Sequence, residues 1–157
     1  MRDAFRRDPQ RALELLDIEP SGRTALLAID PADLEFQAEV LLRKRFESVS
    51  RVIPLTIAKA GQRAWHWFAE YGRACWPASE KPGLEDARGF CSYLGGRSPP
   101  LVCASERNRV RFATGTALAA IHIVPDLLLR DQRHHGLQIF LRRPDGRGRE
   151  VHLLFGL

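Results

Sequence analysis

The spacing of the hydrophobic residues changes once along this chain, and that change limits the folds open to it. Up to about residue 113 apolar residues recur at steps of three or four, as in Leu42, Phe46 and Val49, which is the period of an amphipathic helix. Beyond residue 117 they alternate with other residues, as in a half-buried β-strand. The sequence therefore predicts an α+β fold, with an N-terminal helical bundle followed by a C-terminal three-stranded antiparallel sheet.

Proline marks the expected helix boundaries. Two Asp-Pro dipeptides join an N-cap residue to a proline at the first helical position. They are Asp8-Pro9 and Asp30-Pro31. The first helix is expected to end near Pro20 and the second, a long one, to end or kink at Pro54, because proline cannot donate to the helical ladder. Further helices are expected over residues 62–75, 84–94 and 101–113.

The C-terminal part is expected to form the sheet. Strands are predicted over residues 117–124, 137–142 and 149–155, with Asp145-Gly146 as a hairpin turn between the last two. The adjacent pair His134-His135 is expected in a loop, and one face of the sheet is expected to be covered. The linker Ser98-Pro99-Pro100 divides the prediction into a helical domain, 1–97, and a domain holding the last helix and the sheet, 98–157.

Aromatic and cysteine residues are interpreted mainly as core. Three tryptophans lie within residues 65–76, a cluster typical of a buried core, with a ligand cage as the alternative. Cys75, Cys91 and Cys103 have no C-x-x-C spacing, which favours small buried hydrophobes over a disulfide framework. A zinc site formed by these cysteines with His66 or His122 is the alternative, and no metal site is predicted.

The sequence contains no motif that brings together a nucleophile, a base and oxyanion donors. We therefore expect no enzymatic activity and no cofactor in this chain alone. The start of the chain is charged and has no apolar secretory segment. The most apolar window, residues 117–129, is too short to span a bilayer, so the expected location is the cytoplasm.

The charge is concentrated in the last third. Residues 104–157 hold nine Lys and Arg against five Asp and Glu, which supplies most of the net charge of +5. Such an excess favours an acidic peptide, an acidic protein surface or nucleic acid, and a merely solvated face is the alternative. The candidates for binding an acidic peptide are Arg142, Arg143 and Arg149. The candidates for contact with a partner protein are Arg43, Lys44 and Arg45, which are alternatively paired with Glu39 and Glu47 on the helix surface.

Two stretches resemble a known family. They are LLRKRFESVSRVIPLTIAKAGQRAWHWFAEYGRACWP with the following DARGFCSYL, and the closing GLQIFLRRPDGRGREVHLLF. They are similar to the partner proteins of multinuclear non-heme iron-dependent oxidative enzymes that modify ribosomally made peptides, as in methanobactin and thiaglutamate biosynthesis. The resemblance spans most of residues 4–157, and its motifs are packing positions and turns, with no catalytic signature.

The resemblance implies a non-catalytic subunit in a heterodimer. A separate barrel enzyme would hold the iron and act on a cysteine of a precursor peptide, as in excision of a cysteine β-carbon during thiaglutamate biosynthesis. This chain would capture the peptide with a sheet similar to a peptide-recognition element, by β-augmentation. The first-choice edge lacks charged residues, which usually protect an edge, and the second choice is strand 149–155. The first-choice edge is Leu118, Ala119, Ala120, Ile121, His122, Ile123 and Val124.

Two other functions stay open at this point. A winged-helix-like DNA-binding regulator would use an arginine-bearing helix, residues 101–113, and the basic hairpin that follows. No recognition helix with base-reading side chains stands out, so nucleic acid is the less favoured partner. A small zinc-dependent enzyme is the third candidate.

Overall fold

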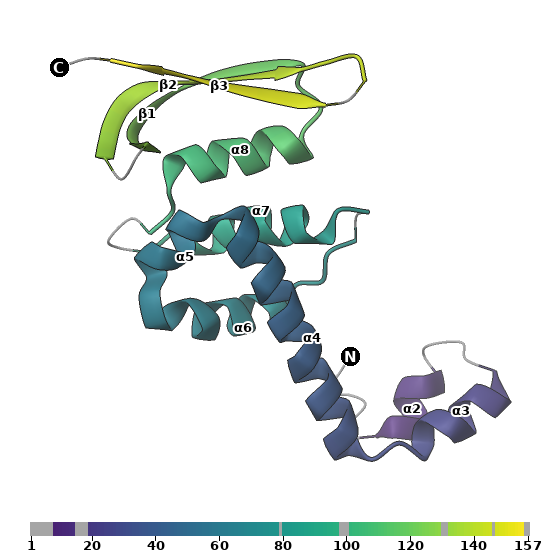
Figure 1. Ribbon diagram of the computed structural model, residues 1–157. Helices are drawn as coiled ribbons and strands as arrows, with labels where there is room; N and C mark the ends of the chain where they lie inside the picture. Colours follow the sequence, from purple (N-terminus) through teal and green to yellow (C-terminus); the bar gives the residue numbers. More distant parts are fainter. Residues whose placement is uncertain are drawn as a thin grey trace. The chain divides into compact units, whose positions relative to one another are not determined.

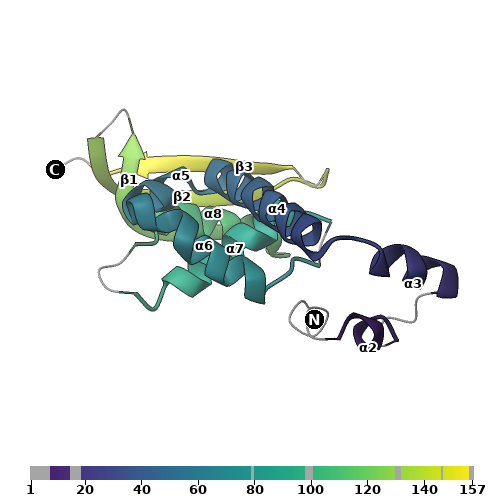
Figure 2. The ribbon, with the colours of Figure 1, turned by 90° about the horizontal axis from the view of Figure 1, so that it is seen from below.

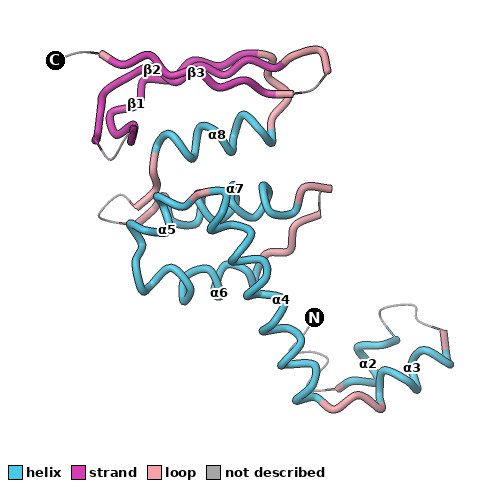
Figure 3. Tube along the Cα trace, viewed as in Figure 1, coloured by secondary structure: helices cyan, strands magenta, loops and turns pink. Residues whose placement is uncertain are grey.

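The computed structural model describes residues 8–14, 19–78, 80–97, 101–129, 132–145 and 147–155. It is α+β, as predicted, with helices followed by a three-stranded antiparallel sheet (Figures 1 and 3). The helices are α2 (Pro9–Glu14), α3 (Pro20–Leu27), α4 (Pro31–Val52), α5 (Pro54–Ala60), the 3-10 turn η1 (Gly61–Arg63), α6 (Ala64–Ala74), α7 (Pro82–Leu94) and α8 (Ala104–Thr114). The strands are β1 (Ala119–Leu129), β2 (Gln132–Arg142) and β3 (Gly148–Leu154).

The chain forms two compact units, Met1–Arg43 and Lys44–Leu157. In the first unit α2 contacts α3, and Leu13 of α2 is buried. The second unit contains the end of α4 and every later element. The boundary predicted at residues 97–98 therefore falls inside the second unit, within the segment that connects α7 to α8.

Prolines begin most of the helices, as the Asp-Pro dipeptides predicted for α2 and α4. Pro20 and Pro54, which the sequence predicts only as the ends of helices, also begin the helices α3 and α5. Proline ends the preceding helix, but its fixed φ also suits the first turn of the next one. At α5 the two following backbone N–H groups, those of Leu55 and Thr56, donate to the buried carboxylate of Glu106 at 2.7 and 2.8 Å. A side chain from α8 thus caps α5.

An aromatic core holds the helices of the second unit together. Phe68 of α6 and Phe90 of α7 are fully buried, with ring centroids 5.3 Å apart in an edge-to-face arrangement. Trp65 is partly buried and lies against Phe46, so the predicted core role of this cluster is confirmed there. Trp76 is the exception, since it is 69% exposed and the Arg45 guanidinium lies over its ring at 4.9 Å.

Helix α8 lies between the sheet and α7. Figure 1 shows the sheet on one side of α8 and α7 on the other, and in Figure 2, seen from below, these layers overlap in projection. Contacts link α8 with α7, β1 and β2. Phe112 of α8 stacks on Phe140 of β2 with ring centroids 5.0 Å apart. Within the second unit the sheet therefore packs mainly on α8, and α8 connects it to the aromatic core.

The strands run in the order β1-β2-β3 and are antiparallel throughout. The hairpin predicted at Asp145-Gly146 is confirmed by the β2–β3 pairing, although Gly146 itself lies outside the described residues. Strands β1 and β2 extend further than predicted. The prediction that His134-His135 lies in a loop is wrong, because both residues belong to β2. A register shift between Val124 and Leu127 lets β1 continue past its proline and pair with this part of β2.

Candidate functional site

Strand β1 is an edge strand, and in the described part of the chain no other strand pairs with its outer margin. The Arg142 N–H donates to the Leu118 carbonyl at 2.7 Å. Hydrogen-bonded pairs recur at every second residue of an antiparallel ladder, so Ala120 also pairs with β2. The residues between, Ala119, Ile121 and Ile123, direct their N–H and C=O groups away from β2. These three residues form an open main-chain margin, which we call the β1 edge.

The side chains of the β1 edge belong to an apolar face of the sheet. Ile121 is 65% exposed and Ile123 is 76% exposed. In register with them on β2 and β3 lie further aliphatic residues, and this side of the sheet, opposite α8, is the outer face. Its three rows are Ala119, Leu141 and Arg149; Ile121, Ile139 and Val151; and Ile123, Leu137 and Leu153. Contiguous apolar surface of this kind marks interaction sites on proteins.

The β1 edge has a defined length. Pro125 follows Ile123 at the next outward-facing position and lacks an N–H, and the register shift begins directly after Val124. Proline and bulges are devices that stop further strands from pairing along an edge. Residues 119–123 are therefore the stretch best able to accept another strand. Of the residues predicted for peptide binding, Ala120 and His122 have their backbone groups committed to β2, as does Val124.

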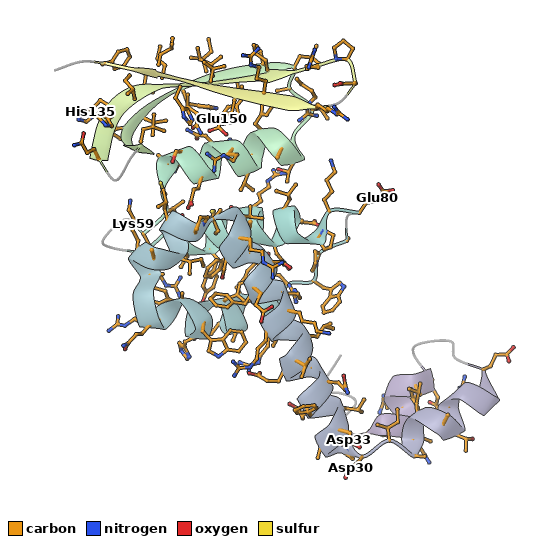
Figure 4. All side chains as sticks on the ribbon, viewed as in Figure 1. Asp30, Asp33, Lys59, Glu80, His135 and Glu150 are labelled. Atoms are coloured by element: carbon orange, nitrogen blue, oxygen red, sulfur yellow. The ribbon has the colours of Figure 1, made fainter. Side chains whose placement is uncertain are left out.

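The other margin, on β3, is the second-choice edge of the sequence prediction, and it is more polar. Its outward-facing backbone groups belong to alternate residues that include Glu150 and His152, since the Phe155 N–H donates to His135 O at 3.0 Å and fixes the alternation. Glu150 and His152 turn their side chains to the inner face, and Figure 4 shows Glu150 directed from β3 toward α8. Charged residues near an edge discourage pairing with another strand. The two margins of the sheet thus differ in character.

A polar network fills the space between α8 and the inner face. The Arg109 guanidinium donates two hydrogen bonds to the Glu150 carboxylate, at 2.7 and 3.0 Å. The Gln138 amide donates to Glu150 Oε1 at 2.7 Å and to Ser105 O at 3.0 Å. His152 Nε2 lies 2.6 Å from Glu150 Oε1. This network fixes the position of α8 under the sheet.

The electrostatics of Glu150 follow from these contacts. Desolvation opposes its ionisation, but the hydrogen bonds from Arg109 and Gln138 outweigh it and lower the pKa of Glu150 to about 2. The same ion pair raises the pKa of Arg109. The carboxylate is therefore charged throughout the physiological range and serves as a structural anion. Sequence reasoning missed this site because its members come from three separate elements.

Two of the three predicted basic residues, Arg142 and Arg149, line one pocket of about 300 Å³ near the β2–β3 hairpin, and Arg143 does not line it. Arg142 and Arg149 lie on opposite faces of the sheet, because Arg149 is in register with Leu141, the neighbour of Arg142. Arg142 donates to Phe112 O at 2.6 Å and stacks over the Phe112 ring. Besides Arg142 and Arg149, the pocket is lined by residues of α8 such as Phe112 and of α7 such as Leu84. Arg143 is exposed in the hairpin loop, where its N–H donates to Arg147 O.

The partner-contact candidates also differ from one another. Arg45 is held inside the second unit, where it forms a two-point ion pair with Asp86 at 2.9 and 2.7 Å and donates to two backbone carbonyls. The hydrogen bond to Asp86 raises its pKa. Arg43, in the first unit, pairs with Glu39 at 3.3 Å. Lys44 is exposed, so surface contact is more readily available to Arg43 and Lys44 than to Arg45.

The cysteines do not gather into a metal site in the described part of the chain. Cys91 and Cys103 are buried and Cys75 is exposed. Over those residues no group of three His, Cys, Asp or Glu side chains is placed to hold a metal ion. Burial, more than the nearby Glu106, raises the pKa of Cys91 to about 12, so its thiol is neutral. This is the behaviour expected of a small core hydrophobe.

One family model is similar to part of this chain. Residues 27–96 match the SCO6045-like C-terminal domain. The match begins at the end of α3, covers α4 to α7, and stops before α8 and the sheet. No curated protein and no solved structure matches the chain. The matched family has no assigned activity, and the β1 edge lies outside the matched residues.

No helix within the described ranges is both long enough and apolar enough to cross a bilayer.

Proposed function

We propose that this chain is a non-catalytic peptide-binding subunit that pairs an extended segment of its substrate along the β1 edge. The observation that carries the proposal is the conjunction of three outward-facing backbone positions, Ala119, Ile121 and Ile123, with the apolar outer face beside them. An incoming strand would gain main-chain hydrogen bonds from the edge. Its side chains on the outer face would also add one more residue to each aliphatic row of the sheet.

The proposal also implies a pattern of side chains in the bound peptide. Side chains on a strand alternate between the two faces, so every second residue of the bound peptide would lie on the outer face beside Ile121 and Ile123. Those positions should favour aliphatic or aromatic residues. Pro125 ends the margin, so the paired segment should span about five residues. Affinity would come from the backbone and specificity from these alternate side chains.

The finer proposal follows from the family resemblance. The peptide would be a ribosomally made precursor, and the partner a barrel-type multinuclear iron enzyme, which would modify a cysteine of that precursor in the cytoplasm. This chain would act as its heterodimeric partner and hold no iron itself. The residues matched by the family model, 27–96, do not include the β1 edge, which is consistent with one region for the enzyme and another for the peptide.

The DNA-binding alternative has less support from the geometry. A winged-helix protein inserts an exposed recognition helix into the major groove, but α8 packs on α7 on one side and on the sheet on the other. Of its arginines, Arg109 is bound to Glu150. The arrangement favours a protein or peptide partner.

The proposal is tested by co-expressing this chain with the barrel enzyme and the short peptide expected beside its gene. We expect the enzyme to co-purify with this chain and the peptide to change mass only when both are present. The variant Ile121→Pro removes one outward N–H and should weaken peptide capture about tenfold or more. Leu154→Pro is the matched control, because it removes an outward N–H from the β3 margin.

Circular dichroism of both variants excludes misfolding as the cause. Full-rate modification of the peptide by the barrel enzyme alone would refute the role. Equal loss of capture in Ile121→Pro and Leu154→Pro would refute the choice of edge.

A further inference from the structure

A second pocket of about 300 Å³ lies between α7 and α8, away from the outer face of the sheet. Its walls carry three arginines, Arg88 from α7 and Arg107 and Arg111 from α8. Arg107 and Arg111 are four residues apart on α8 and therefore share one face of that helix. The pocket is open to solvent, and all three arginines are exposed. It is a site of concentrated positive charge built from two helices.

The charge of this pocket is uncompensated. Its lining contains no Asp or Glu, which leaves a formal charge of +3. Among the residues that the structure describes, none of the three guanidinium groups forms an ion pair or a hydrogen bond. Two other arginines of the second unit are matched with acids, Arg45 with Asp86 and Arg109 with Glu150. Three like charges close together repel, so this arrangement is unfavourable until an anion occupies it.

The base of the pocket is apolar. Cys91, Val102 and Val110 line it, and both Cys91 and Val110 are buried. The thiol of Cys91 is neutral because burial raises its pKa. A low-dielectric floor strengthens the attraction between the arginines and an anion above it. The floor also leaves room for a small apolar body attached to that anion.

We propose that this pocket binds a phosphate dianion, either free or as the phosphate group of a small phosphorylated molecule. Each guanidinium presents a planar fork of donors that fits two oxygens of a phosphate. A dianion offsets most of the +3 charge, whereas a single carboxylate would leave two charges unmatched. The volume is at the small end of the range for ligand pockets, which suits a phosphate with a short substituent. The site is distinct from the β1 edge and does not depend on the peptide-binding role.

Isothermal titration calorimetry of the full chain tests the proposal, with inorganic phosphate, glycerol phosphate and malate as ligands at constant ionic strength. We expect saturable binding of phosphate that weakens about tenfold or more in Arg107→Gln and again in Arg107→Gln/Arg111→Gln, because each removes a charged hydrogen-bond donor. Arg51→Gln is the matched control. Arg51 is also an exposed helical arginine, but it is absent from the pocket lining.

Comparing the affinities of the three ligands distinguishes a site for free phosphate from a site for a phosphorylated molecule. Tighter binding of glycerol phosphate than of inorganic phosphate assigns the site to a phosphorylated molecule, and equal affinity assigns it to the free ion. Binding of glycerol phosphate should also strengthen as the pH rises through about 6, where a phosphate monoester changes from a monoanion to a dianion. Malate binding as tightly as phosphate, no saturable binding of phosphate, or equal losses in Arg107→Gln and Arg51→Gln would overturn the proposal.

Discussion

The inner face of the sheet presents Gln138, Glu150 and His152 to α8, whereas the outer face presents rows of isoleucine, leucine and valine. An antiparallel sheet with one covered face normally buries its apolar side and leaves its polar side in water. Here the more apolar side is the one left open within the second unit. The hydrogen bonds and ion pair beneath the sheet compensate the buried polar groups, since Arg109 and Ser105 of α8 supply their partners. No element among the described residues of that unit packs on the outer face, so its aliphatic side chains are left exposed to solvent.

The largest expected effect contrasts two neighbours on β2 that lie on opposite faces. Phe140 is 2% exposed and stacks on Phe112, so Phe140→Ala should lower the free energy of unfolding by about 3 to 5 kcal/mol. Ile139→Ala, on the outer face, should lower it by about 1 kcal/mol or less. Urea unfolding followed by circular dichroism measures both. Equal losses would mean that the outer face is also covered in solution, and the contrast between the faces would then be wrong.

The sequence predicted the existence of the strands but not the face that α8 covers. Because side chains alternate between the two faces of a strand, Ile121 and Ile123 must share one face, but the sequence does not say which face packs on a helix. The choice of side depends on α8, where Asn108 and Arg109 complement polar groups of β2 and β3. Those pairings join residues up to 41 positions apart, and no local pattern encodes them. The Asp-Pro starts of α2 and α4 could be predicted from the local sequence, whereas the network around Glu150 could not.

The arginines show the same limit. The spacing of Arg107 and Arg111 could have indicated a shared helix face, because they are four residues apart. Nothing in the sequence indicated that Arg88 lies across the same pocket, since the packing of α7 on α8 decides that. Conversely, the adjacent triplet Arg43 to Arg45 suggested one basic contact, but the structure commits Arg45 to Asp86. Arg43 and Arg45 are therefore close in the sequence, but their side chains bind different partners, Glu39 and Asp86.

A smaller effect tests the polar side of the comparison through its pH dependence. The folded-state pKa of Glu150 is lowered to about 2, below its unfolded value of about 4.3. Its contribution to stability is therefore fully present above about pH 4.5 and is lost as the pH falls toward 2. Because the carboxylate is partly exposed, solvent screening limits this contribution to about 1 to 2 kcal/mol.

Comparison with Glu150→Gln isolates that contribution, since the other carboxylates titrate alike in both proteins. Urea midpoints measured at several pH values between about 6 and 2.5 should converge for wild type and variant as the solution becomes acidic. Parallel curves, with a constant difference between the two proteins, would show that the ion pair with Arg109 does not stabilise the sheet.

The smallest expected effect on stability concerns the outer face. Ile121→Ser/Ile123→Ser removes two exposed aliphatic side chains from the β1 edge and leaves its backbone groups in place. Because these side chains are 65% and 76% exposed, the free energy of unfolding should change by only about 0.5 kcal/mol. Peptide capture should nevertheless fall, since the bound strand would lose its apolar neighbours. Such a separation of stability from binding is expected of a surface kept apolar for a partner, because residues that serve the fold cannot be replaced by serine without loss. A stability loss above about 2 kcal/mol, or unchanged capture, would mean that the aliphatic rows serve the fold rather than a partner.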